Sequence, residues 1–326
     1  MPDLLLLTWS FIAAAGSSGG CFAAGRLLSA AIRGRASTCP GAASETMASM
    51  AIALGIGVGI IIQGHIPAVP PGSALDRCLV LLLPAFTGVE LLAGRFRNRP
   101  RLAVSSRVLL AAFVPGVLLF QSVHIGMVDG RGLLQIPAEG VMLLSLCCVI
   151  AVSATVSLQF SSPLPPLVRA VACTGTLHCA GILIMLGGWI RGGAAVLPMT
   201  GAICGVLGAC CFVGEPRVSA AAGRWAGWCL LNMVFCGHFF GRLSGVDSAA
   251  LLLTVFAIPL IVVCLPPGHR RRGSALVLLS TVIVTGVLLW FAWVRFSERM
   301  RPLMATVNTT KSDSSVGDQV GHDRQA

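Results

Sequence analysis

Long apolar runs separated by short polar stretches recur along the whole chain. A helix needs about 17 to 25 mostly apolar residues to cross a hydrocarbon core about 30 Å thick, and each run meets this length. Because a segment in lipid must satisfy its own backbone hydrogen bonds, every run is predicted to be a helix. The ten predicted spans are residues 4–32, 47–66, 78–94, 108–128, 141–160, 171–190, 197–214, 225–243, 249–265 and 274–294.

The two ends of the chain complete this prediction. The first run begins almost at Met1 and has no basic leader, so we expect a retained span and not a cleaved signal peptide. It is longer than the others but too short for two full crossings, which leaves ten spans as the prediction and eleven as the alternative. The expected fold is an all-α, transporter-like polytopic bundle over residues 1–294, followed by a polar, disordered tail over residues 295–326.

Composition supports a membrane protein and excludes several other classes. The 326 residues are 56% hydrophobic and only 11% charged, against about 25% charged in soluble domains. The net charge of +11 is divided among short loops, so no nucleic-acid partner is predicted. The thirteen cysteines form no CxxC pair. Phosphate-binding, zinc-protease and EF-hand motifs are missing from the sequence as well, and neither a metal nor a cofactor is expected.

Arginine distribution predicts the orientation of the spans. Cytoplasmic loops of membrane proteins carry an excess of basic residues. The odd-numbered loops contain thirteen arginines and the even-numbered loops four, which places the odd loops in the cytoplasm and both chain ends in the lumen or exterior. The topology anchors are Arg95, Arg97, Arg99, Arg101, Arg270, Arg271 and Arg272.

The tail contains evidence for both sides of the membrane. Arg295, Arg299 and Arg301 follow the last span and by themselves favour a cytoplasmic end. Asn308 begins an Asn-Thr-Thr sequon, which is an acceptor for N-glycosylation if the tail is lumenal. The bias summed over all loops favours the lumenal tail, with Asn308 as the candidate glycosylation site.

A few ionisable residues lie inside the predicted spans. A charge at the bilayer centre costs about 3 kcal/mol or more, so such residues are functional candidates that should face the bundle interior or a water-filled cavity. The alternative is that these residues have no function: the histidines are neutral and bonded to nearby carbonyls, and Glu90 reaches water at the loop. The candidates for an intramembrane polar pathway are Glu90, His124, His178 and His238, with His65 near a span end.

Glycines spaced four apart indicate close helix packing. Two glycines at this spacing share one helix face and let a neighbouring backbone approach. The alternative is coincidence, because the chain has 38 glycines. The five pairs are Gly16/Gly20, Gly55/Gly59, Gly201/Gly205, Gly223/Gly227 and Gly237/Gly241.

Two short motifs resemble those of the rhomboid intramembrane serine proteases. Gly16-Ser17-Ser18-Gly19 matches their GxSG, and the segment from His238 to Gly245 resembles their HxxGxxxG helix. The resemblance implies that Ser18 is a nucleophile and His238 its base. In rhomboids these helices lie close together in sequence, whereas six predicted spans separate them here. A protease of this type is therefore the remote alternative, and no enzyme is predicted.

The last third of the chain resembles a viral family. Its order of segments resembles that of the UL43-type multi-span envelope proteins of alphaherpesviruses: Arg242-Leu243-Ser244, an apolar span, Arg270 to Arg272 and a final apolar span. Those envelope proteins are similar in predicted fold to equilibrative nucleoside transporters. The single lysine, Lys311, among 23 basic residues fits a GC-rich herpesvirus genome. The resemblance implies a non-enzymatic protein of the virion envelope and host membranes. Its expected partners are the lipid bilayer and other envelope membrane proteins, with an effect on fusion or cell-to-cell spread.

The same resemblance does not predict a transported substrate for this protein. The paired acidic and basic residues that nucleoside transporters place in one span have no clear counterpart here. The alternative function is a small-solute transporter of the nucleoside or drug/metabolite type. Ten-span drug/metabolite carriers keep both termini in the cytoplasm, so topology separates them from the orientation predicted above.

Overall fold

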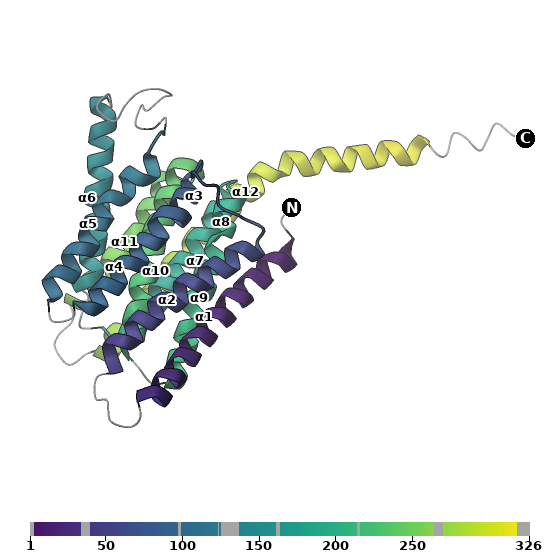
Figure 1. The fold of residues 1–326 in the computed structure, drawn as a ribbon. Coiled ribbons are helices and arrows are strands. Elements are labelled where there is room, and N and C mark those ends of the chain that lie inside the picture. Colours follow the sequence, from purple (N-terminus) through teal and green to yellow (C-terminus); the bar gives the residue numbers. More distant parts are fainter. Residues whose placement is uncertain are drawn as a thin grey trace, which may run out of the picture.

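The structure, a computed structural model, is mainly helical, and the residues that it describes contain no strand. The helices pack side by side into one bundle (Figure 1). The predicted all-α polytopic bundle is confirmed. The described residues are 3–33, 40–96, 99–122, 124, 137–160, 164–213, 216–263 and 270–317.

Each of the ten predicted spans coincides with a helix or with consecutive helical segments. The third span consists of α3, the π-helix η2 and α4, and the seventh consists of α8 and α9. The elements are α1 (Leu4–Arg33), α2 (Pro40–Ile62), α3 (Ala74–Arg77), η2 (Cys78–Leu82), α4 (Leu83–Arg95), α5 (Pro100–Leu119), α6 (Ala138–Phe160), α7 (Pro166–Leu186), α8 (Ile190–Ala194), α9 (Val196–Val213), α10 (Pro216–Phe240), α11 (Gly245–Val263) and α12 (Arg270–Gly317).

Eight segments of the described chain are long and apolar enough to cross a membrane, judged by length and composition. They correspond to the first seven predicted spans and the last one. The eighth span matches α10, which carries Arg224 within its length, and the ninth matches α11, whose described apolar part is Gly245–Ala257. All ten predicted spans therefore correspond to helical segments of the described chain, but eight of them have the length and apolar composition of a span, so the count of ten crossings stays a prediction.

Helix α10 lies in the centre of the bundle (Figure 1). It packs against α2, α6, α7, α9 and α11, and Trp225 and Asn232 on it are fully buried. The amide Nδ2 of Asn232 donates to the Trp228 carbonyl at 2.7 Å. Because protein surrounds α10, this helix can carry polar residues that a lipid-facing helix cannot.

Close glycine contacts hold α1 against α9. A Cβ built on Gly205 would lie 2.1 Å from the Ala15 carbonyl oxygen, so only glycine fits there. A Cβ on Gly16 or Gly20 would meet no atom within 4 Å. The predicted Gly16/Gly20 interface is therefore wrong: these glycines point away from the neighbouring helices, and the contact uses Gly19, which approaches Gly205. In the other four predicted pairs every glycine except Gly241 faces a neighbouring helix, and Gly241, just after α10, lies against the Trp189 ring. These pairs are Gly55/Gly59, Gly201/Gly205, Gly223/Gly227 and Gly237/Gly241.

Helix α12 passes through residue 295 without a break and continues to Gly317. Its last part projects away from the bundle, at the end where α1 begins (Figure 1). The predicted boundary between bundle and tail thus falls inside a helix, and the predicted disorder of the tail stays a prediction. Both Nη2 contacts of Arg295 to the Asp247 carboxylate are 2.8 Å. This pair neutralises one of the three tail arginines that favoured a cytoplasmic end.

The structure also changes the arginine count. Arg107, Arg169 and Arg224, three of the thirteen arginines assigned to odd loops, lie at least three residues inside a helix and are not exposed. Arg77 of the even loops is buried where α3 continues into η2. Ten arginines of the odd loops then remain against three of the even loops, so the predicted orientation keeps its basis. Of the anchors, Arg97 and the side chains of Arg270 and Arg271 lie outside the described residues. The exposed anchors are Arg95, Arg99, Arg101 and Arg272.

Candidate functional site

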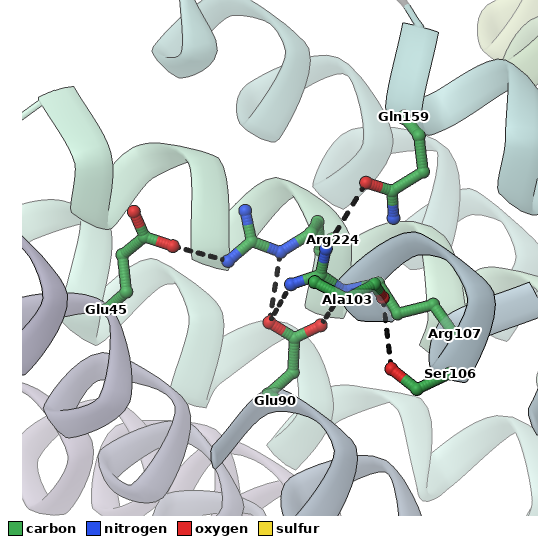
Figure 2. A network of polar contacts seen from close by, with 7 residues as sticks. All are labelled: Glu45, Glu90, Ala103, Ser106, Arg107, Gln159 and Arg224. Atoms are coloured by element: carbon green, nitrogen blue, oxygen red, sulfur yellow. Dashed lines mark hydrogen bonds and ion pairs between the residues drawn. The ribbon is translucent and has the colours of Figure 1, made fainter. Parts of the chain in front are cut away.

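Glu90 lies at the centre of a buried ion-pair network (Figure 2). Its side chain on α4 is only 1% exposed. From α5, Arg107 donates through Nε to Oε1 at 2.6 Å and through Nη2 to Oε2 at 3.0 Å. From α10, Arg224 donates through Nε to Oε2 at 3.0 Å. The carboxylate is therefore held between two guanidinium groups and does not reach water at the loop.

Arg224 extends the network to a second carboxylate. Its Nη2 donates to Glu45 Oε2 on α2 at 2.9 Å. At the other side, Arg107 Nη1 makes a longer contact of 3.4 Å to Gln159 Oε1 on α6. We call Glu45, Glu90, Arg107, Gln159 and Arg224 the charge cluster. It connects α2, α4, α5, α6 and α10, and its two positive and two negative charges cancel.

The charge cluster lies near the arginine-rich end of the bundle. Glu90 is five residues before the end of α4, Glu45 is five residues after the start of α2, and Gln159 is one residue before the end of α6. Each is within about two helical turns of a helix end, at 3.6 residues per turn. The charges are thus inside the bundle but close to the predicted cytoplasmic surface.

Aromatic residues form an apolar wall beside the cluster. The Phe86 ring stacks on Trp228, with centroids 4.6 Å apart, and meets Trp225 edge-on at 4.8 Å. A cavity of about 30 Å³ lies between this wall and the side chains of Arg107 and Arg224. A water molecule needs about 10–15 Å³ of such volume, so the cavity has room for two or three waters at most. The site is therefore too small for an organic solute and fits a role in holding the helices together.

Sequence reasoning found Glu90 but missed its two arginine partners. Arg107 and Arg224 were assigned to loops because the predicted spans start at residues 108 and 225, at the first residue after each charge. The helices begin earlier, at Pro100 and Pro216. The signal that could have found them is Glu90 itself, because a buried carboxylate requires a cationic partner.

The four candidate pathway residues do not form one site. His124 Nε2 contacts the Phe239 carbonyl at 2.8 Å, and His238 Nδ1 contacts the Leu243 carbonyl at 3.3 Å, so both histidines lie near the end of α10. His178 is exposed on α7. Glu90 belongs to the charge cluster near the other end. For His124 and His238 the geometry matches the alternative without a function, in which the ring is bonded to a nearby carbonyl.

The rhomboid-like pair is not assembled. Ser18 is buried between α1 and α9, where its hydroxyl contacts the Ala202 carbonyl at 2.8 Å and the Ala15 carbonyl at 3.1 Å. The His238 ring contacts Leu243 and the Ser248 hydroxyl. Ser18 and His238 thus have separate partners, and the catalytic dyad expected from the two motifs does not form.

A larger cavity of about 580 Å³ lies at the opposite end of the bundle. It is bounded by the start of α1, the segment after α2, α3 and α8. Among its polar residues, His65 Nε2 contacts Asp76 Oδ1 at 3.1 Å. Gln63 and Arg191 complete the polar part of the wall. Cavities of this size hold small-molecule ligands in many proteins.

Across the described part of the chain, no group of three or more histidine, cysteine or acidic residues is placed to hold a metal ion. No family model, no curated protein and no solved structure matches the chain. The helical bundle, the apolar segments and the internal charge cluster define an integral multi-pass membrane protein.

Proposed function

We propose that this multi-pass membrane protein is a non-enzymatic component of a viral envelope and of host membranes that modulates membrane fusion or cell-to-cell spread. The family proposal rests on the order of Arg242-Leu243-Ser244, Arg270 to Arg272 and the two final apolar spans, and on the arginine-rich, lysine-poor composition. The observation that carries the non-catalytic part is the charge cluster, whose groups neutralise one another and connect five helices.

The outer face of α12 supports action through other membrane proteins. This helix packs mainly against α7 and α11. Its other side presents large apolar residues, including Trp290, Phe291 and Trp293, which are 67%, 58% and 58% exposed. In a bilayer such a face contacts lipid or the transmembrane segment of a partner, and aromatic residues near helix ends are typical of the membrane interface. We take this face as the contact with other envelope proteins.

A cell–cell fusion assay tests the proposal. We expect co-expression with alphaherpesvirus fusion glycoproteins to lower content mixing between cells relative to an empty vector. The physical reason is that α12 would bind the transmembrane segments of these glycoproteins. The double variant Trp290→Ala/Trp293→Ala should lose this effect. Trp9→Ala is the matched control, since Trp9 is 61% exposed on α1. Content mixing equal to the vector at equal surface expression contradicts the proposal.

The second candidate function is a small-solute transporter. The observation that favours it is the 580 Å³ cavity, which is large enough for a small organic solute. A ten-span carrier of the drug/metabolite type holds both termini in the cytoplasm. The side of the membrane on which the tail lies therefore distinguishes this candidate from the first one.

Glycosylation of the tail measures its side. Asn308 begins the only Asn-x-Ser/Thr sequon in the sequence. We expect the protein made in mammalian cells to carry a glycan that is removed by endoglycosidase and lost in Asn308→Gln, because ten crossings with cytoplasmic odd loops leave the tail in the lumen. Asn98→Gln, in loop three and outside any sequon, should leave the mobility unchanged. Digestion of a tail tag by protease added only to the cytosolic side would show that the orientation is reversed.

A further inference from the structure

The wall of the large cavity, at the predicted exterior end of the bundle, has an apolar part and a polar part. Five large apolar side chains line the cavity, together with three alanines: Leu6, Leu7, Ile66, Leu75 and Ile190. Gln63, His65, Asp76 and Arg191 form the polar part. Its volume of about 580 Å³ lies inside the range of about 300–1,000 Å³ usual for small-molecule sites. A ligand that fills it therefore meets apolar and polar groups at once.

The internal hydrogen bonds of the polar wall leave particular atoms free. Gln63 Nε2 donates to Ser10 Oγ at 3.0 Å and to the Ala194 carbonyl at 2.8 Å, which holds the amide in place. A carboxylate only accepts hydrogen bonds, so the 3.1 Å contact with Asp76 assigns the proton of His65 to Nε2. The Nδ1 atom of His65 then carries no proton and remains only as a hydrogen-bond acceptor.

Asp76 accepts hydrogen bonds on both of its carboxylate oxygens. Besides His65, its carboxylate accepts through Oδ2 from the Ser73 backbone at 3.2 Å and from the Ser73 hydroxyl at 2.7 Å. The bond from the Ser73 backbone and the bond from the Asp76 N–H to Ser73 Oγ at 3.1 Å form the capping box at the start of α3. The carboxylate is thereby fixed as an acceptor for the imidazole and is not available for a cationic ligand.

Arg191 supplies the positive charge of the wall. It belongs to α8, is exposed, and has no ion pair with the acidic residues that the structure describes. A guanidinium group presents its donors as a planar fork that matches a carboxylate or phosphate. The positive charge beside an apolar wall selects a ligand with an anionic head and an apolar body.

We propose that this cavity binds an amphipathic organic anion. Its anionic head group pairs with Arg191, and its apolar chain lies along Leu6, Leu7, Leu75 and Ile190. A water-soluble fatty acid and an anionic membrane lipid share this chemistry. The proposal concerns binding at equilibrium, so it depends neither on solute transport nor on the effect in fusion.

The first test is equilibrium binding of radiolabelled octanoate to the full-length protein in a neutral detergent. We expect saturable binding, displaced by excess unlabelled octanoate. Arg191→Gln should weaken the affinity by at least about ten-fold, since charge-assisted hydrogen bonds contribute about 1.5–3 kcal/mol and 1.4 kcal/mol equals ten-fold. Arg95→Gln is the matched control, because Arg95 is exposed at the other end of the bundle. Thermal melting of each variant checks that it is folded.

Competition tests the two halves of the ligand separately. Octanol lacks the charge and acetate lacks the apolar chain, so each should displace octanoate much less well than octanoate itself. Displacement by phosphatidylcholine nanodiscs that contain phosphatidic acid, and not by pure phosphatidylcholine nanodiscs, supports the proposal with a lipid as the ligand. Failure of both nanodiscs to displace octanoate supports it with a water-soluble acid. Equal octanoate binding by wild type and Arg191→Gln, or equal displacement by octanol and octanoate, would overturn it.

Discussion

Glu90→Gln is expected to destabilise the bundle by about 3–5 kcal/mol, which is the usual effect of removing one partner from a buried ion pair. The change removes the negative charge that two guanidinium groups share, and the side chains of Arg107 and Arg224 are only 10% and 13% exposed. Glu45 and Gln159 can compensate part of this loss, since each contacts one arginine. The glutamine side chain keeps the shape of glutamate, so the effect reports on charge and not on packing.

The melting temperature in detergent measures this effect. A thiol-reactive fluorophore follows unfolding, because Cys78, Cys173 and Cys229 are buried and react once the helices separate. We expect a decrease of more than about 5 °C. Glu139→Gln is the matched control, an exposed acid in the first turn of α6, and should change stability by less than about 0.5 kcal/mol.

A double variant separates loss of charge from loss of contacts. Glu90→Gln/Arg107→Gln removes the Arg107 charge, which the single variant leaves without an ion pair, whereas Arg224 keeps its pair with Glu45. The double variant should therefore melt above Glu90→Gln. If Glu90→Gln has the same melting temperature as Glu139→Gln, the charge cluster contributes no stability. In that case the observation that carries the non-catalytic proposal would be lost.

Gly205→Leu is expected to separate α1 from α9. A Cβ at Gly205 would lie 2.1 Å from the Ala15 carbonyl oxygen and 2.5 Å from Ser18 Oγ. The first of these contacts is with backbone, which cannot rotate away, so the helix itself must shift. Overpacking of this kind usually costs about 1–3 kcal/mol, and a four-carbon side chain at a backbone contact should reach or exceed the upper limit.

Gly208→Leu is the control on the same helix. No atom lies within 4 Å of a Cβ at Gly208. Because leucine is a better helix former than glycine by about 0.8 kcal/mol, this variant should melt at or slightly above the wild-type temperature. The same thiol-reactive melting assay measures both variants. Equal melting temperatures for Gly205→Leu and Gly208→Leu would rule out the close α1–α9 contact.

Predicted and observed helices differ most where a charge lies inside a span. The span predicted at residues 108–128 corresponds to α5 (Pro100–Leu119), and the span predicted at 225–243 corresponds to α10 (Pro216–Phe240). Both predicted limits begin immediately after an arginine, since a scan for apolar residues treats every charge as a loop. A charge that faces a partner inside the bundle is compatible with a helix, and only the partner's position reveals it.

The glycine motifs show the same limit. The spacing of Gly16 and Gly20 equals that of Gly201 and Gly205, yet only the second pair lies at a helix contact. Spacing predicts that two glycines share a face of a helix. It does not predict which face meets a neighbour, because that depends on how each helix is rotated in the bundle.

The sequence by itself determined that this chain is an all-α membrane bundle, because apolar runs of spanning length in lipid can only be helices. It also determined the arginine bias between odd and even loops and gave Glu90 as a candidate acid inside a span. Only the tertiary structure decided that Arg107 and Arg224 neutralise Glu90, that Ser18 and His238 have separate partners, and that Arg191 and His65 share a cavity. These are contacts between residues far apart in the chain, and they depend on the order and rotation of packed helices, which local hydrophobicity does not specify.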